Sequence, residues 1–416
     1  MSGQTPPDPY RAVAERYVKL VLAVGQHDGD YVDAFYGPAE WRAQAVAAKR
    51  PLAEIDRDAA AAAEQLSTIA VKPDPRDAEM WGLRRQFLSR QLAALRSRVA
   101  MLQGARLTFD EESKALYDAV APAKPESEFA GVVAQLSAVL PGDGPLIERY
   151  DRFKQQFVIP TNRLDRVFQQ AIRACRERTP GVNLPLQERF TVEYVTNKAW
   201  SGYNWYQGNF KSLIQVNTDL PVYIDRAIDL ACHEGYPGHH VYNALLEKTL
   251  VKDRGWIEYT VYPLFSPQSL IAEGTANYGI DVAFPLPSRL AFERDVLFPI
   301  AGLNPDRVAE YYTVLGLVQR LSYAGNEAAR NYLDGKIDRA AAVAWMEKYA
   351  LQTRPRAEQW LKFVEQYRSY VINYNLGKDL VGAYVEKRMG RDQTPQRRWA
   401  EFMALLSSPR LPSELK

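Results

Sequence analysis

Three of the four histidines in this 416-residue chain fall within eight positions, in the run His233-Glu234-Gly235-Tyr236-Pro237-Gly238-His239-His240. Imidazole is the commonest protein ligand of transition metals. One frequent zinc site places two histidines four positions apart on a helix, with a glutamate beside the first as general base. The run therefore predicts a metal site at which Glu234 deprotonates a metal-bound water.

The spacing of these histidines departs from that pattern. His233 and His239 are six positions apart, and His233 and His240 are seven apart. On an unbroken helix the second pair would lie about 10.5 Å apart along the axis, a long reach for one ion. Pro237 and Gly238 can bulge the helix, since proline lacks a backbone donor and glycine accepts unusual dihedral angles. We favour His239 as the second ligand and keep His240 as the alternative; the unused histidine would lie behind the ligands or face the substrate.

A third ligand is expected on a later helix. Ser266-Pro267 has the form of an N-cap followed by proline at the first helical position, and the helix that it opens carries Glu273. Two histidines and a glutamate form a set that leaves a coordination position on Zn²⁺ for water. The same set also serves oxygen-dependent non-haem iron enzymes, although these have no evident use for Glu234. A closed site that used both later histidines would instead indicate a non-catalytic zinc-binding or peptide-binding protein.

These motifs resemble those of the bacterial family catalogued as domain of unknown function 885, whose signature is His-Glu-x-x-Pro-Gly-His-His. The segment 273–278 is similar to the family's Glu-Gly-x-Ala-x-Tyr motif, and 368–377 is similar to its C-terminal helix. The resemblance covers residues 185–385 best. It implies a gluzincin-like zinc metallopeptidase with a cleft between helical lobes. Our first hypothesis is that the substrate is a peptide or a small amide.

The same resemblance implies that Tyr374 or Tyr370 stabilises the oxyanion and that Arg368 binds a carboxylate of the substrate. A tetrahedral intermediate needs a donor opposite the metal, and two tyrosines four positions apart share a helix face. Either tyrosine can instead anchor two helices through its hydroxyl.

Two further segments are candidates for contact with the substrate. The aromatic stretch 200–210 is typical of a loop, and it either lines a substrate pocket through Tyr203 or fills a core. The strand expected at 213–217 can pair with an extended substrate as an edge strand, which would make Asn217 a substrate contact.

The elements that position these residues are mostly helices. Apolar residues recur with helical spacing over 10–24 and 88–102, and Thr108 with Glu111 has the form of a capping box. Alternation over 190–194 and the run 212–218 predict only two short strands. We therefore expect a mainly α, zincin-like fold with a small β element beside the site. A helical lobe over 1–180 and a metal-binding lobe over 181–416 would pack as one unit.

Composition excludes several classes of protein. A formal charge of +2 gives no reason to expect nucleic acid as a partner, and the arginines between 84 and 98 are expected on a solvated helix face. The longest apolar run is too short to cross a membrane. Cys175 and Cys232 are expected as free thiols, and the N-terminus has no pattern of a secretion signal. These features predict a cytoplasmic protein, and its oligomeric state is left open.

Overall fold

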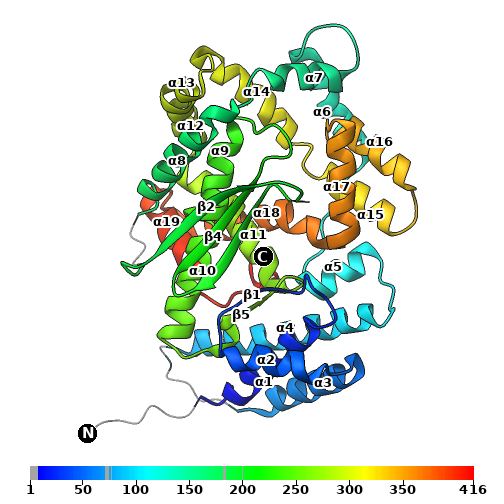
Figure 1. Cartoon of the computed structure of the whole chain (residues 1–416), viewed down its shortest axis with the longest axis vertical. Helices are drawn as coiled ribbons and strands as arrows, with labels where there is room; N and C mark the ends of the chain where they lie inside the picture. The colour runs from blue at the N-terminus through cyan, green and yellow to red at the C-terminus, as the bar shows by residue number, and fades with distance from the viewer. Residues whose placement is uncertain (1–7, 71–74, 76, 181–183, 199) are drawn as a thin grey trace.

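The computed structural model describes residues 8–70, 75, 77–180, 184–198 and 200–416. Helices surround a small sheet near the middle of the molecule, and the N-terminal helices gather at the bottom of Figure 1. The predicted mainly α fold with a small β element is confirmed.

The α-helices fall into three groups along the view of Figure 1. The bottom group is α1(Arg11–Val24), α2(Ala39–Ala48), α3(Leu52–Thr68), α4(Ala78–Leu102) and α5(Phe109–Tyr117). The top and right group is α6(Glu126–Val139), α7(Leu146–Gln155), α12(Leu286–Phe292), α13(Phe298–Ala301), α14(Val308–Gln319), α15(Ala324–Leu333), α16(Arg339–Tyr349) and α17(Arg354–Tyr367). The middle group is α8(Thr161–Glu177), α9(Asp225–Leu230), α10(His239–Leu246), α11(Pro267–Ala283), α18(Ile372–Met389) and α19(Pro395–Leu406).

Short π and 3₁₀ segments connect or extend these helices. The π segments are η1(Ala231–Gly235), η2(Glu247–Lys252) and η4(Glu293–Leu297). The 3₁₀ segments are η3(Ile257–Thr260), η5(Pro305–Arg307), η6(Arg368–Val371) and η7(Pro412–Glu414). The capping box of Thr108 and Glu111 is present, and Ser266 with Pro267 opens α11 as predicted.

The main sheet holds three strands in the order β2-β4-β3, with bounds β2(Arg189–Val195), β3(Gly202–Gly208) and β4(Lys211–Asn217). β4 is parallel to β2 and antiparallel to β3. Because β4 is paired on both sides, the prediction that it is an edge strand is wrong. β3 replaces most of the loop predicted over 200–210. A separate antiparallel pair joins β1(Val32–Phe35) to β5(Val261–Pro263).

The closest helix pair in the middle group is α11 with α18. A Cβ added to Gly274 would lie 2.5 Å from the carbonyl carbon of Gly377, and one added to Gly377 would lie 2.8 Å from the carbonyl oxygen of Leu270. Only glycine lets the two backbones approach this closely. The contact brings the segment after residue 368 against the helix that carries Glu273.

The buried apolar residues form two clusters, and each draws on residues from both sides of position 180. One cluster joins α1, α3 and α4 to the start of α11 and to η6; the other joins α8, α10 and α14 to the end of α11 and to α19. The division into lobes 1–180 and 181–416 stays a prediction, and residues 181–183 at its boundary lie outside the described residues.

The two cysteines are not free thiols. Cys175 of α8 and Cys232 of η1 form a disulfide that joins chain segments 57 residues apart. The prediction of thiols is wrong because α8 packs directly on η1, with Cα atoms of the two cysteines 5.6 Å apart. Disulfides are rare in the cytosol, so one support for the predicted cytoplasmic location is lost, and that location stays a prediction. The described helices include none with the length and apolar character of a membrane span.

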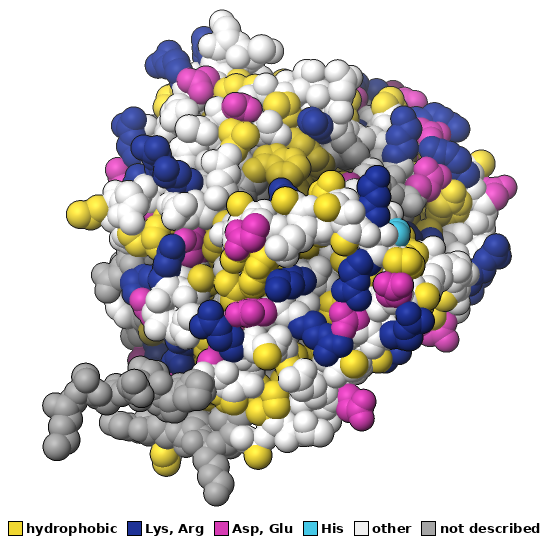
Figure 2. All heavy atoms as spheres, turned by 60° about the horizontal axis from the view of Figure 1, so that its bottom comes forward, with side chains coloured by type: hydrophobic (Ala, Val, Ile, Leu, Met, Phe, Trp, Pro, Cys, Tyr) yellow, Lys and Arg dark blue, Asp and Glu magenta, His cyan; other side chains and the backbone are white. Residues whose placement is uncertain are grey.

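Charges on the face shown in Figure 2 are mixed, with basic and acidic side chains interspersed. The arginines of α4 are not all solvated: Arg84 is fully buried and donates to Glu258 through Nε at 2.5 Å. Arg96 pairs with Asp56 at 2.8 Å on the surface. Arg98 is also largely buried and pairs with Asp28 at 2.7 Å, so the predicted solvated face is wrong for Arg84 and Arg98.

Candidate metal centre

The helix that carries His233 stops before the other two histidines. α9 continues into η1, which ends at Gly235, and Tyr236 is extended with φ −116° and ψ 118°. The backbone then turns back, so that the amide of Gly238 donates to the carbonyl of Cys232 at 2.9 Å. A Cβ at Gly238 would lie 1.8 Å from the carbonyl oxygen of His233, which restricts this position to glycine. The helix is thus interrupted where we predicted a bulge, and the interruption returns the start of α10 to His233.

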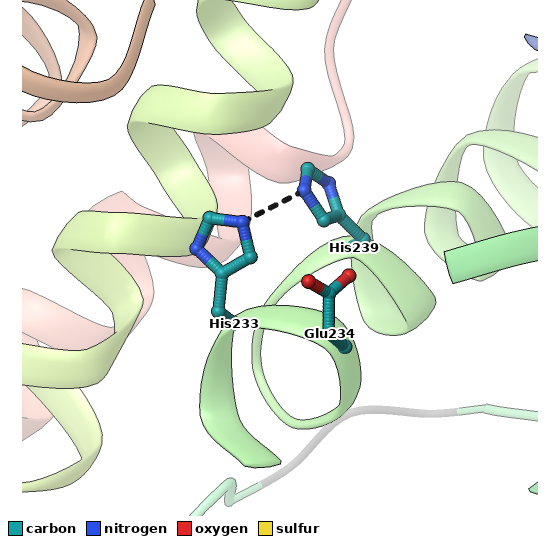
Figure 3. Close-up of side chains that lie close together, drawn as sticks. All are labelled: His233, Glu234 and His239. Atoms are coloured by element: carbon teal, nitrogen blue, oxygen red, sulfur yellow. Dashed lines mark hydrogen bonds between the residues drawn. The ribbon is translucent and has the colours of Figure 1, made fainter. Parts of the chain in front are cut away.

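His233, His239 and Glu273 converge on one point (Figure 3 shows the two histidines). The Nε2 atoms of the histidines are 3.1 Å apart, and Oε2 of Glu273 lies 3.2 Å from that of His233 and 3.7 Å from that of His239. A tetrahedral zinc with bonds of about 2.0–2.1 Å separates its ligand atoms by about 3.3 Å. The three atoms therefore have the spacing of one face of a zinc tetrahedron.

Glu273 shows the clearest sign of an absent partner. Its Oε2 atom is buried and, within the described part of the chain, makes no hydrogen bond of sound geometry. Burial opposes ionisation of this carboxyl, but His239 and His233 hold its pKa well below the usual range. Burial alone would lower the pKa of His239, and the Glu273 carboxylate raises it to about 9. A buried carboxylate aimed at two imidazoles fits a divalent cation.

Contacts behind the ligands fix their orientation. Nδ1 of His233 lies 3.2 Å from Oδ1 of Asn277, and the hydroxyl of Tyr370 donates to Oε1 of Glu273 at 2.8 Å. Partners of this kind hold a metal-binding ring or carboxylate in place. Sequence reasoning gave Asn277 no role, although its position one turn after Glu273 was a usable signal.

His240 does not reach this centre. It is fully buried, with Nε2 at 2.6 Å from Oε1 of Glu188 and Nδ1 at 2.8 Å from the hydroxyl of Ser212. Both ring nitrogens are therefore occupied, which leaves His239 as the partner of His233. Glu188 was missed because nothing near it in sequence marks it as a partner of a residue 52 positions away.

Glu234 lies beside the histidines, and its carboxylate turns toward them (Figure 3). A carboxylate oxygen of Glu234 and one ring nitrogen each of His233 and His239 lie within 4.8 Å of one another. The set that includes Glu273 is tighter, with distances of 3.1 to 3.7 Å. Burial raises the pKa of Glu234, and the two histidines partly offset this effect. No described residue donates a hydrogen bond to its carboxylate. This carboxylate is therefore free to accept a proton.

The two tyrosines predicted to stabilise the oxyanion differ in their surroundings. Tyr370 is buried and its hydroxyl is already engaged by Glu273. Tyr374 is 37% exposed and lines the cavity that contains the candidate metal centre, and none of the described residues hydrogen-bonds its hydroxyl. Tyr374 is thus the tyrosine whose hydroxyl is available to a substrate.

The predicted substrate contacts have different outcomes. Arg368 does not line the cavity, and its Nε donates to Oε2 of Glu112 at 2.6 Å; its contact with a substrate carboxylate stays a prediction. Asn217 does not line it either, but it lines a smaller adjoining cavity, and its amide donates to the carbonyls of Lys198 and Trp200. Its contact with a substrate stays a prediction. Tyr203 does line the cavity.

Tyr203 contacts an acidic residue, Asp33, that we did not predict from the sequence. Its hydroxyl donates a hydrogen bond to Asp33 of β1, which lines the same cavity. Burial raises the pKa of Asp33 to about 6, against the lowering effect of Tyr203. Asp33 lies 200 positions before His233 and has no local motif, so only the fold brings it here.

The cavity that joins these residues has a volume of about 1330 Å³. Its walls include His233, Glu234, His239 and Glu273 on one side and aromatic residues of α17 and α18 on another. This volume is large enough for several residues of a peptide.

Comparison with known proteins is sparse. No family model matches the chain, and no curated protein matches it. A solved structure described as a putative lipoprotein from Colwellia psychrerythraea has a TM-score of 0.51 and 16% identity; the match covers 87% of this chain and 65% of that one. A putative lipoprotein of unknown function from Shewanella oneidensis has a TM-score of 0.49 and 14% identity, with 91% and 78% covered. This chain therefore spans just under two thirds of the Colwellia protein, with which it shares a fold.

Proposed function

We propose that this protein is a zinc-dependent hydrolase of the gluzincin type that cleaves a peptide or a peptide-like amide. The observation that carries the proposal is the triangle of His233 Nε2, His239 Nε2 and Glu273 Oε2, with edges of 3.1 to 3.7 Å. The resemblance to the domain of unknown function 885 family, made on the same residues, supports it.

Each residue has a distinct task in such a reaction. Bound zinc would polarise the scissile carbonyl and acidify a water. Glu234 accepts the proton of that water and passes it to the leaving amine, and its raised pKa brings it closer to neutral pH. The hydroxyl of Tyr374 donates to the oxygen that becomes negative in the tetrahedral intermediate. Asn277 and Tyr370 hold His233 and Glu273 in position.

The competing functions account for fewer of these residues. An oxygen-dependent iron enzyme uses the same three ligands but leaves Glu234 without a task. A closed, non-catalytic zinc site needs a fourth protein ligand, and His240 is committed to Glu188 and Ser212. Hydrolysis gives Glu234 and Tyr374 a task in addition to the three ligands.

The test is metal analysis of the purified protein combined with digestion of a peptide library. We expect near-stoichiometric zinc in the wild type, loss of zinc and cleavage in His233→Ala, and retained zinc without cleavage in Glu234→Gln. His27→Ala is the matched control, because His27 is exposed and the one hydrogen bond of its ring to a described residue goes to the carbonyl of Arg50. Full activity of Glu234→Gln, or iron with oxygen uptake, would refute the proposal.

A further inference from the structure

Three cationic side chains from separate helices line one wall of the cavity. They are Lys154 of α7, Arg226 of α9 and Arg356 of α17. Nζ of Lys154 lies 3.9 Å from the ring centre of Tyr223, and the guanidinium carbon of Arg356 lies 5.3 Å from the same point. All three also line a smaller adjoining cavity of about 230 Å³. Positive charge is thus concentrated where the two cavities meet.

Acidic neighbours neutralise only part of this charge. Arg226 pairs with Asp229 at 3.1 Å, and the same carboxylate also takes Arg289 at 2.8 Å. Neither Lys154 nor Arg356 has an ion-pair partner among the residues that the structure describes. Burial lowers the pKa of the Lys154 ammonium; Asp225 opposes this effect, and Arg356 and Arg226 reinforce it.

Two further acids lie near this wall. Asp151 lines the smaller cavity and is half-buried. Asp225 is buried and its Oδ1 accepts a hydrogen bond of 2.6 Å from Tyr311. Two half-buried cations that repel each other are stabilised when an anion enters between them. The wall therefore has the electrostatic character of an anion site.

The distance from this wall to Glu234 follows from the helical run that carries both Arg226 and Glu234. Arg226 precedes Glu234 by eight residues on the continuous run of α9 and η1, which corresponds to about 10–12 Å along the axis. Arg226 also lowers the pKa of Glu234, so their charges interact. An extended peptide advances about 3.3 Å per residue, so about three residues fit between the two positions.

We propose that Lys154 and Arg356, assisted by Arg226, bind a carboxylate of the substrate, and that this is its C-terminal carboxylate. The protein would then cut short fragments from the carboxyl ends of peptides. Cleavage of the peptide rests on the proposed hydrolase function, whereas binding of the carboxylate does not. An acidic side chain presents the same chemical group, so the experiment separates the two sources.

Binding is measured on Glu234→Gln, in which turnover is removed, with three probes. They are N-acetylated pentaalanine with a free carboxyl end, the same peptide with an amidated end, and an amidated peptide with glutamate at its fourth position. Charge-assisted hydrogen bonds contribute about 1.5–3 kcal/mol, so we expect the free acid to bind about 10- to 100-fold more tightly than the plain amide. Lys154→Met and Arg356→Gln, singly and together, should remove this preference and leave binding of the amide unchanged.

Matched controls come from the same helix. Arg354→Gln and Lys362→Met change exposed residues of α17 that line neither cavity, and both should keep the preference for the free acid.

Two results would overturn the proposal. One is equal affinity of the Glu234→Gln parent for the acid and the amide, including binding too weak to detect for both. The other is a preference for the acid that survives the double variant. Tight binding of the glutamate peptide supports the carboxylate site but overturns its assignment to the chain end. Peptide cleavage without any carboxylate preference refutes this inference alone, whereas carboxylate-dependent binding without any cleavage by the wild type refutes the hydrolase alone.

Discussion

The hydroxyl of Tyr370 donates a 2.8 Å hydrogen bond to one oxygen of Glu273, while the other oxygen of that carboxylate faces His233 and His239. Tyr370 thereby holds the carboxylate in the orientation that a metal ligand needs. This relationship separates its task from that of Tyr374, although the two residues are adjacent on one face and their rings are 5.8 Å apart.

Tyr370→Phe should weaken zinc binding by about 10- to 100-fold, because an unsupported carboxylate ligand is free to rotate. Tyr374→Phe should keep zinc affinity and lower kcat by about 10²- to 10³-fold, as expected for the loss of one oxyanion donor. Competition with a zinc chelator and steady-state kinetics on both variants measure the two effects. Equal effects of both variants on zinc affinity would contradict this division of roles.

His239→Ala should abolish zinc binding, whereas His240→Ala should retain it and destabilise the fold. Removal of the His240 ring leaves Glu188 buried with fewer partners, which costs about 1–3 kcal/mol or more in unfolding free energy. Elemental analysis and urea denaturation distinguish the two variants. If the folded His240→Ala protein loses zinc, the second ligand is His240 and the assignment of His239 is wrong.

Asp33 should make stability depend on pH. Its pKa in the folded protein is about 6, above the value of 3.8 for an ordinary aspartate. The contribution of this group is therefore fully present below about pH 4 and is lost as the pH rises through about 6. Relative to Asp33→Asn, the metal-free wild type should lose up to about 3 kcal/mol of unfolding free energy between about pH 4 and about pH 7.

The control for this experiment is Asp143→Asn, which alters an exposed carboxyl in the loop before α7. Denaturant titrations of the three proteins across the pH range give the comparison. A constant difference between wild type and Asp33→Asn at every pH would mean that Asp33 titrates normally.

Reduction of the disulfide should destabilise the protein. Closure of a 57-residue loop restricts the unfolded chain by an amount worth about 4 kcal/mol in the chain-entropy description. Cys175→Ser with Cys232→Ser should lower unfolding free energy by a similar amount. Mass spectrometry after alkylation, with and without reductant, establishes the bond. Two alkylated cysteines in protein taken from an oxidising preparation without reductant would contradict it.

The residues that converge on the candidate metal centre were predictable because their signals are local. The histidine run carries its own proline and glycine, and Glu273 follows a recognisable helix start at Ser266. Ambiguity between His239 and His240 persisted because it depends on the dihedral angles at the interruption, and these depend on packing between backbones.

The errors come from contacts between distant parts of the chain. The ion pair of Arg368 with Glu112, which lies 256 positions earlier, was not predicted. Asp33 and the disulfide depend in the same way on helices and strands that meet only in the folded chain. The strand β3 was missed because Gly202, Asn204 and Gly208 are of types depleted in strands and typical of loops, which masked the strand preference of its three aromatic residues.

The contact between Gly274 and Gly377 has a consequence for how such a protein can change. Gly274 adjoins Glu273, and Gly377 follows Tyr374 by three positions, so a main-chain contact sets the distance between the proposed metal ligand and the proposed oxyanion donor. Side chains elsewhere on the cavity wall take no part in this contact. Substitutions there can alter the substrates that an ancestor or descendant accepts while the reacting groups keep their spacing. We therefore expect relatives to differ in the substrates that they accept before they differ in the reaction that they catalyse.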